Sequence, residues 1–81
     1  MKIAIIDDQQ EIRYSVSKIL QRNNHTTVSF NGEEINLSEQ IEELGIELLI
    51  IDVMLSETLT GIDLIKRFKK AKIELPIILM T

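Results

Sequence analysis

Cysteine is absent from the 81 residues of this chain, and glycine and proline are scarce. Without cysteine, neither a disulfide nor a thiolate metal site can stabilise the protein. Glycine occurs only at Gly32, Gly45 and Gly61, and none of these positions forms the glycine-rich loop that holds a nucleotide phosphate. The sequence therefore disfavours a nucleotide-binding protein of that kind.

Basic residues are outnumbered, with nine Lys and Arg against thirteen Asp and Glu and a formal net charge of -4. A nucleic-acid-binding surface needs clustered Lys and Arg against phosphates, so this balance argues against one. Long hydrophobic runs are also missing, because the apolar stretch in residues 1–6 leads straight into acids and is too short for a signal peptide or a membrane span. We therefore expect a cytoplasmic protein with neither a nucleic-acid nor a membrane partner.

Four stretches have the composition of β-strands. Residues 47–55 hold four consecutive apolar residues without alternation, which indicates a strand covered on both faces, as in parallel sheets flanked by helices. Residues 2–6 form a similar run. Residues 26–30 are β-branched and polar, which suits an edge strand. Residues 76–80 begin with Pro76, at the first position of a strand, where a missing N–H donor is tolerated.

Helical periodicity predicts three helices between these strands, over residues 9–23, 38–44 and 62–71. Ser38 is a candidate N-cap of the second helix, and Gly45 is placed to end it. Each helix is predicted to bury the face that carries its regularly spaced apolar residues. These are Ile12, Val16, Ile19 and Leu20 in the first helix, Leu37, Ile41 and Leu44 in the second, and Ile62, Ile65 and Phe68 in the third.

Strands and helices thus alternate along the whole chain. Such alternation, with crossovers of this length, predicts an α/β fold whose parallel sheet is wound in right-handed βαβ units. At 81 residues the chain holds at most one small domain.

Acidic residues follow two of the predicted strands, Asp7 and Asp8 after residues 2–6 and Asp52 at the end of the central run. If the two strands are parallel neighbours, the three carboxylates meet in the crevice where such sheets bind ligands. They would repel one another unless a hard cation binds there, and Mg²⁺ suits oxygen ligands with retained waters. A metal beside a free carboxylate is, in outline, a site that accepts a phosphoryl group. The plainer alternative is that Asp7 and Asp8 only cap a helix.

Several segments together resemble the receiver domain of bacterial two-component response regulators. They are residues 3–13, residues 31–34, residues 48–55, Gly61 with the helix after it, and residues 75–81. The resemblance implies a flavodoxin-like, doubly wound parallel sheet of the CheY type. It also implies a function in signalling, in which the domain receives a phosphoryl group from a sensor histidine kinase or a phosphotransfer protein.

Residue roles follow from the same resemblance. Asp52 matches the phosphoacceptor, and Asp7 and Asp8 match the Mg²⁺-binding acids, with the backbone carbonyl of Met54 as a further ligand. Thr81 matches the hydroxyl residue that turns toward the phosphoryl group, although a β-branched residue at a strand end also has a simple packing explanation. Such a domain assists its own phosphorylation but is not an enzyme in its own right.

Two departures from the family pattern stand out. Ser56 occupies a position where proline is common, and the loop from Ser56 to Gly61 is one residue longer. The family domain also continues beyond the threonine through a helix, a fifth strand and a fifth helix, and that portion carries an activating lysine. We therefore expect residues 1–81 to form a single, partial receiver domain that is truncated after its fourth strand. Residues 76–80 would then be an apolar edge, so we expect a homo-oligomer through that edge or through uncovered sheet faces.

Two functions stay open at this point. The first is a phosphoacceptor module, and the second is a binding or dimerisation module that keeps the scaffold but is not phosphorylated. A hydrolase with an aspartate nucleophile is disfavoured, because it would carry a second acid just after Asp52 for proton transfer. In this sequence the next acid is Glu57.

Overall fold

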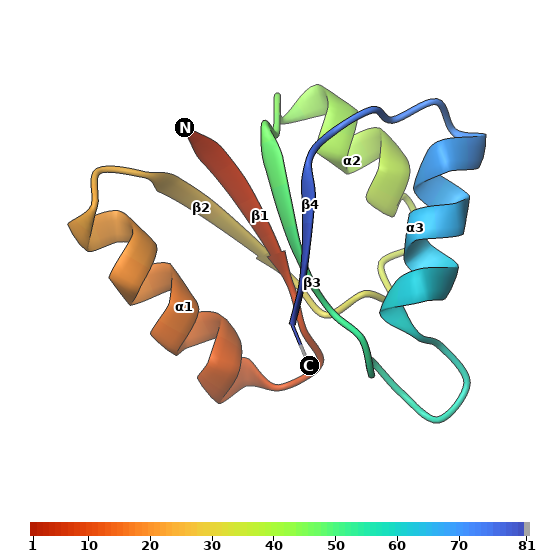
Figure 1. Cartoon of the computed structure of the whole chain (residues 1–81), viewed down its shortest axis with the longest axis horizontal. Helices are drawn as coiled ribbons and strands as arrows, with labels where there is room; N and C mark the ends of the chain where they lie inside the picture. The colour runs from red at the N-terminus through yellow and green to blue at the C-terminus, as the bar shows by residue number, and fades with distance from the viewer. Residues whose placement is uncertain (81) are drawn as a thin grey trace.

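The computed structural model describes residues 1–80, so Thr81 lies outside the described residues. Its strands and helices alternate as predicted (Figure 1). In chain order the elements are β1 (Lys2–Ile6), α1 (Gln10–Arg22), β2 (Thr26–Phe30), α2 (Leu37–Glu43), β3 (Leu48–Asp52), α3 (Gly61–Lys70) and β4 (Ile77–Met80).

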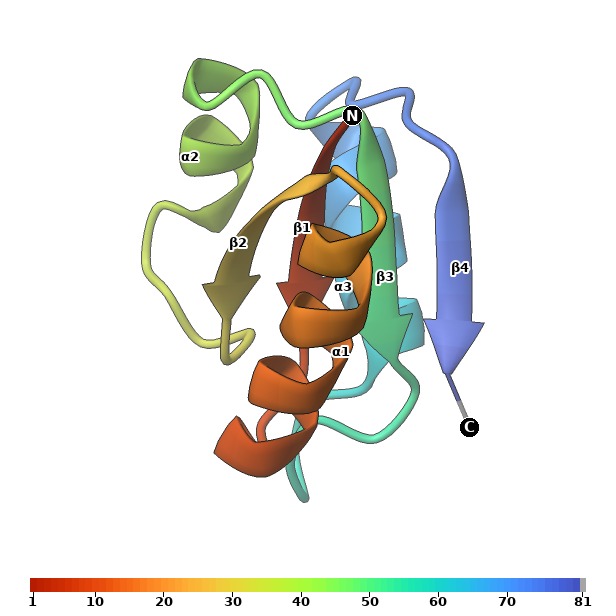
Figure 2. The ribbon, with the colours of Figure 1, turned by 90° about the vertical axis from the view of Figure 1, so that its left-hand side faces the viewer.

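All four strands belong to one parallel sheet in the order β2-β1-β3-β4. Figure 2 shows the strands running in the same direction. This is the flavodoxin-like order through its first four strands, so the predicted fold class is confirmed. β2 lies at one edge, as its polarity indicated, and β4 lies at the other. The carboxyl ends of β1 and β3 are adjacent, with Ile6 beside Ile51.

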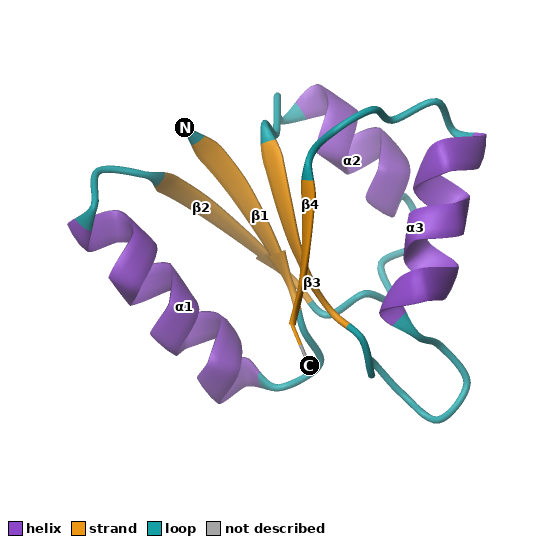
Figure 3. Cartoon of the chain, viewed as in Figure 1, coloured by secondary structure: helices purple, strands orange, loops and turns teal. Residues whose placement is uncertain are grey.

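The main core lies between the sheet and the helices α2 and α3, which cover one face together (Figure 3). Ala4, Ile6, Leu49 and Ile51 of the two central strands point into it. Their neighbours Ile3, Ile5 and Ile50 are also buried but belong to the opposite face, because side chains alternate along a strand. This explains why both central strands are continuously apolar.

Helix α1 lies on the opposite face and packs against β1 and β2. We expected it to bury one side, but among residues 1–80 it contributes no fully buried side chain. Val16 and Leu20 are half-buried, whereas Ile12 and Ile19 are 38% and 57% exposed. The prediction was wrong in extent because, in the described part of the chain, α1 is the one helix on this face and its flanks stay open (Figure 1).

Helix α2 begins one residue earlier than predicted, and its N-cap is Asn36 rather than Ser38. Ser38 lies inside the helix, so its predicted capping role was wrong. Leu37 and Ile41 are buried, which confirms that part of the predicted face. Gly45 follows the helix with φ of +67°, a left-handed conformation that glycine adopts without strain, and this confirms the predicted helix end.

Helix α3 also begins one residue earlier, at Gly61, and the side it buries is rotated from the predicted one, although Ile65 is half-buried against the core as expected. Phe68 is buried as expected, but Ile62 is 48% exposed and Leu64 is buried in its place. This rotation has a local cause, because Gly61 lies against the backbone carbonyl of Asp52 and has to face the sheet there. Leu64 and Phe68 follow Gly61 on the same side.

The edge strand β4 is less covered than the other apolar strands. Ile78 is 51% exposed on the α1 face, and Leu79 is 42% exposed on the opposite face. The described residues contain no helix with the length and apolar character that crossing a membrane requires.

Candidate functional site

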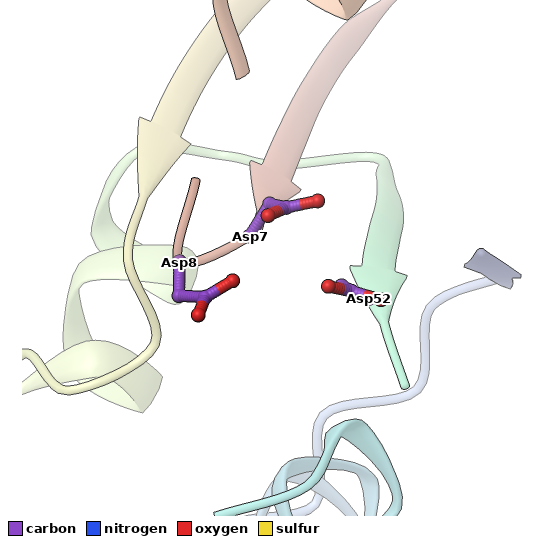
Figure 4. A group of neighbouring side chains, drawn as sticks. All are labelled: Asp7, Asp8 and Asp52. Atoms are coloured by element: carbon purple, nitrogen blue, oxygen red, sulfur yellow. The ribbon is translucent and has the colours of Figure 1, made fainter. Parts of the chain in front are cut away.

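Three predicted site residues meet at one rim of the sheet. Asp7 and Asp8 follow β1, Asp52 ends the adjacent strand β3, and one carboxylate oxygen from each residue lies within 4.8 Å of the others. Figure 4 shows the three side chains gathered below the strand ends. The parallel pairing of β1 with β3 creates this cluster, because it brings both carboxyl ends to the same edge.

Asp7 is the buried member of the cluster, with only 3% of its surface exposed. Its Oδ1 accepts a hydrogen bond from the Gln9 N–H at 2.8 Å, and its own N–H donates to the Phe30 carbonyl at 3.1 Å. Burial raises the pKa of the Asp7 carboxyl, the Gln9 N–H opposes that rise, and the charges of Asp52 and Asp8 add to it. Negative charge at this position is therefore destabilising until a cation offsets it.

The other two carboxylates face solvent. Asp8 is exposed and Asp52 is half-buried. Both line an open hollow together with Gln9, Met54, Ser56 and Glu57. A set of hard oxygen donors beside open space fits Mg²⁺, which binds carboxylates while keeping several of its waters. The residues present therefore fit the ion that the sequence predicted.

The residue after Asp52, Val53, is held by main-chain hydrogen bonds on both sides. The Val53 N–H donates to the Met80 carbonyl at 3.0 Å, and the Gly61 N–H donates to the Val53 carbonyl at 2.7 Å. The Met54 N–H points back to Asp52 Oδ1 at 3.4 Å. Met54 lines the hollow and its side chain is 63% exposed, while its role as a carbonyl ligand stays a prediction.

The loop between Asp52 and α3 is closed by its own hydrogen bonds. The N–H groups of Leu55 and Ser56 both donate to the Leu59 carbonyl, at 3.3 and 3.0 Å. Ser56 Oγ accepts from the Leu59 N–H at 3.0 Å. The serine that replaces the family's common proline thus helps to fold the loop, since its hydroxyl bonds to the backbone three residues on.

Sequence reasoning missed Gln9 and Arg13 as neighbours of the cluster. Arg13 belongs to the predicted helix over residues 9–23 but not to its apolar face, and its Nη1 donates to the Asp7 carbonyl at 2.6 Å. A signal was available, because side chains in the first turns of a helix lean toward its N-terminus. A long residue there reaches the loop that precedes the helix. Thr81, the remaining predicted site residue, lies outside the described part of the chain.

The family model for the response regulator receiver domain matches residues 3–81. This chain belongs to the receiver domain family. The predicted resemblance is therefore confirmed, and receiver domains are in general phosphoacceptors of two-component signalling rather than true enzymes. No curated protein matches this chain in sequence.

Solved structures share the fold. The chemotaxis protein CheY4 of Vibrio cholerae is 23% identical, with a TM-score of 0.82 over 96% of this chain. The receiver domain of a modulated diguanylate cyclase from Desulfovibrio desulfuricans G20 is also 23% identical, with a TM-score of 0.81 over 99% of the chain. NtrX of Brucella abortus is 29% identical, with a TM-score of 0.80 over 96% of the chain.

These relatives are longer than the chain. The matched region is 65% of the Vibrio protein, 63% of the Desulfovibrio receiver domain and 18% of NtrX.

Proposed function

We propose that this chain is a phosphoacceptor receiver module in which Asp52 takes a phosphoryl group in the presence of Mg²⁺. The observation that supports it is the meeting of Asp7, Asp8 and Asp52 at one solvent-open rim. Asp7 and Asp8 would hold the ion, together with Asp52 and the backbone carbonyl of Met54. When bound, Mg²⁺ supplies positive charge that offsets the carboxylates and the incoming phosphoryl oxygens.

The chain's own contribution is the position of its nucleophile. An oxygen of the Asp52 carboxylate attacks the phosphorus of a phosphohistidine, the bond from phosphorus to the imidazole nitrogen breaks, and the imidazole leaves. Asp52 is half-buried at the rim of the hollow, so a donor can approach it from solvent. The contacts of Val53 and Gly61 hold the neighbouring main chain, which favours reaction by fixing the geometry.

The proposed donor is a sensor histidine kinase or a phosphotransfer protein, in the cytoplasm. The chain would be a substrate that assists its own phosphorylation. Within the same proposal, Thr81 is the switch hydroxyl that responds to the phosphoryl group, and residues 1–81 are one partial receiver domain.

Phosphorylation can be tested with a small phosphodonor such as acetyl phosphate, followed by intact mass measurement. We expect Mg²⁺-dependent addition of one phosphoryl group to the wild type and none to Asp52→Asn. Asp63→Asn is the matched control, because it also removes one carboxylate but lies in the capping box of α3. An unlabelled wild type at saturating Mg²⁺ would refute the proposal.

A second candidate function, a binding module that forms a homo-oligomer without phosphorylation, is supported by the edge strand β4. Ile78 and Leu79 are half-exposed there, and an apolar edge recruits further strands. We propose a second copy of the chain as the partner, bound through this edge or through the uncovered part of the sheet.

Light scattering at micromolar concentration tests this second candidate. We expect a dimer for the wild type and a monomer for Ile78→Lys, which places a charge on the edge strand. Ile35→Lys is the control, since Ile35 is 98% exposed and lies outside the sheet. A wild type that stays monomeric and well folded would rule out the oligomer.

A further inference from the structure

Arg13 makes a contact that has no role in the sheet, the core or the proposed phosphorylation step. It lies near the N-terminus of α1, and its Nη1 donates to the carbonyl oxygen of Asp7 at 2.6 Å. Its own N–H donates to the carbonyl of Gln9 at 3.2 Å, while the Gln9 N–H donates to Asp7 Oδ1 at 2.8 Å. The buried acid and the first turn of α1 are thereby joined in one closed set of hydrogen bonds.

The location of this cation near the start of α1 is unfavourable for the helix by itself. The N-terminus of a helix carries partial positive charge, so Lys and Arg are favoured at the opposite end. Arg13 is half-buried rather than extended into water, and its guanidinium lies against the peptide that precedes the helix. The guanidinium is therefore partly removed from water and donates a specific hydrogen bond to the main chain of Asp7.

That contact acts on position rather than on the charge of the carboxylate. The pKa of the Asp7 carboxyl responds to burial, to the Gln9 N–H and to the charges of Asp52 and Asp8. Arg13 instead bonds the carbonyl oxygen, which belongs to the peptide that links Asp7 to Asp8. Because this peptide is planar, fixing its oxygen also fixes the direction in which the chain continues to Asp8.

We propose that Arg13 is a positioning residue for the acidic cluster. By holding the Asp7 carbonyl, it sets the relative orientation of the Asp7 and Asp8 carboxylates. The inference rests on the proposed Mg²⁺ site, for which orientation matters because Mg²⁺ demands near-ideal octahedral geometry. Residues that do not touch the metal but hydrogen-bond to its ligands contribute about 10- to 100-fold to metal affinity in known sites.

Positioning and simple electrostatics predict opposite results for the loss of Arg13. Removing a positive charge near three carboxylates would by itself tighten the binding of a cation. Removing a contact that orients two of the ligands would weaken it. The sign of the change in Mg²⁺ affinity therefore distinguishes the two effects.

The experiment is a calorimetric Mg²⁺ titration of the wild type, Arg13→Gln and Arg22→Gln. Arg22 is the matched control, because it is the last residue of the same helix and loses the same charge. We expect about tenfold weaker binding for Arg13→Gln and unchanged or slightly tighter binding for Arg22→Gln. Equal or tighter binding by Arg13→Gln would overturn the inference.

Amide hydrogen exchange without metal gives a second readout. In Arg13→Gln we expect faster exchange at the Gln9 amide, whose acceptor is the Asp7 side chain, and unchanged exchange within β1. Faster exchange throughout β1 would mean that Arg13 only stabilises the fold, and it too would overturn the inference. A wild type that binds no Mg²⁺ would refute the proposed metal site, whereas a metal-binding wild type matched by Arg13→Gln would refute the positioning role alone.

Discussion

Gly61 lies directly against the backbone carbonyl of Asp52. A Cβ at position 61 would overlap that carbonyl oxygen and would lie 2.9 Å from Ile51 Cγ2, closer than real Cβ contacts. The Gly61 N–H also donates to the Val53 carbonyl at 2.7 Å. The start of α3 and the proposed phosphoacceptor are therefore in main-chain contact, and only glycine fits between them.

Gly61→Ala should disturb both the fold and the site. We expect a loss of about 1–3 kcal/mol in the free energy of unfolding, the usual cost of overpacking, together with weaker Mg²⁺ binding as Asp52 shifts. Gly45→Ala is the control, because it has open space around it but a φ of +67°. It should cost about 1 kcal/mol through backbone strain and leave Mg²⁺ affinity unchanged. Urea unfolding and calorimetry check both variants, and equal Mg²⁺ affinities would contradict the coupling.

Asp7→Asn should stabilise the metal-free protein at neutral pH. Burial raises the pKa of the Asp7 carboxyl above its ordinary value of 3.8, so the folded state holds that proton more tightly than the unfolded state does. The contribution of the Asp7 carboxyl to the free energy of unfolding is therefore full below pH 3.8, its ordinary pKa. It is lost as the pH rises through the raised pKa of the folded state. The advantage of Asp7→Asn should be largest above that range and shrink as the pH falls. Urea unfolding in EDTA measures it, and a variant less stable than the wild type at pH 7 would contradict the prediction.

Asp63 should show the opposite pH dependence. Its carboxylate accepts from the Thr60 N–H at 3.1 Å, while Thr60 Oγ1 accepts from the Asp63 N–H at 3.2 Å. This capping box lowers the pKa of Asp63 below its ordinary value of 3.8. The stability advantage of the wild type over Asp63→Asn should be full above pH 3.8, the ordinary pKa. It should fall as the pH drops through the lowered pKa of the folded state. Unfolding at about pH 6 and about pH 3 compares the two, and a difference that grows at low pH would refute the assignment.

Stability should be distributed unequally over the two faces of the sheet. Phe68 of α3 is 1% exposed in the main core, and Phe68→Ala should cost about 3–5 kcal/mol, which is enough to unfold a domain of this size. Ile19 of α1 is 57% exposed, so Ile19→Ala should cost less than about 1 kcal/mol. Circular dichroism during urea titration measures both. Similar costs for the two variants would show that α1 is packed more tightly than its exposure indicates.

The type and order of the elements could be predicted from local sequence. Runs such as residues 48–52 have no alternation because both faces are covered, and the helices between the strands carry apolar residues at helical spacing. The meeting of Asp7 with Asp52 also followed, since acids at the ends of parallel neighbours share one edge. These features depend on the period of the pattern and on chain connectivity, which the sequence contains.

Features that depend on distant contacts could not be predicted in the same way. The spacing of Ile62, Ile65 and Phe68 gave a plausible face for α3, but the rotation of the helix follows from the approach of Gly61 to Asp52. The exposure of Ile19 depends on how much of its sheet face the helices cover, which no local pattern records.

By itself, the sequence of this protein determined an alternating α/β chain with acids at the ends of two strands, because side-chain periodicity and backbone propensity are local properties. Only the tertiary structure decided which side of each helix is buried, how far α1 stays open to solvent, and that Arg13 turns back to the peptide of Asp7. Those outcomes are set by steric fit and hydrogen bonds between segments that meet only after folding.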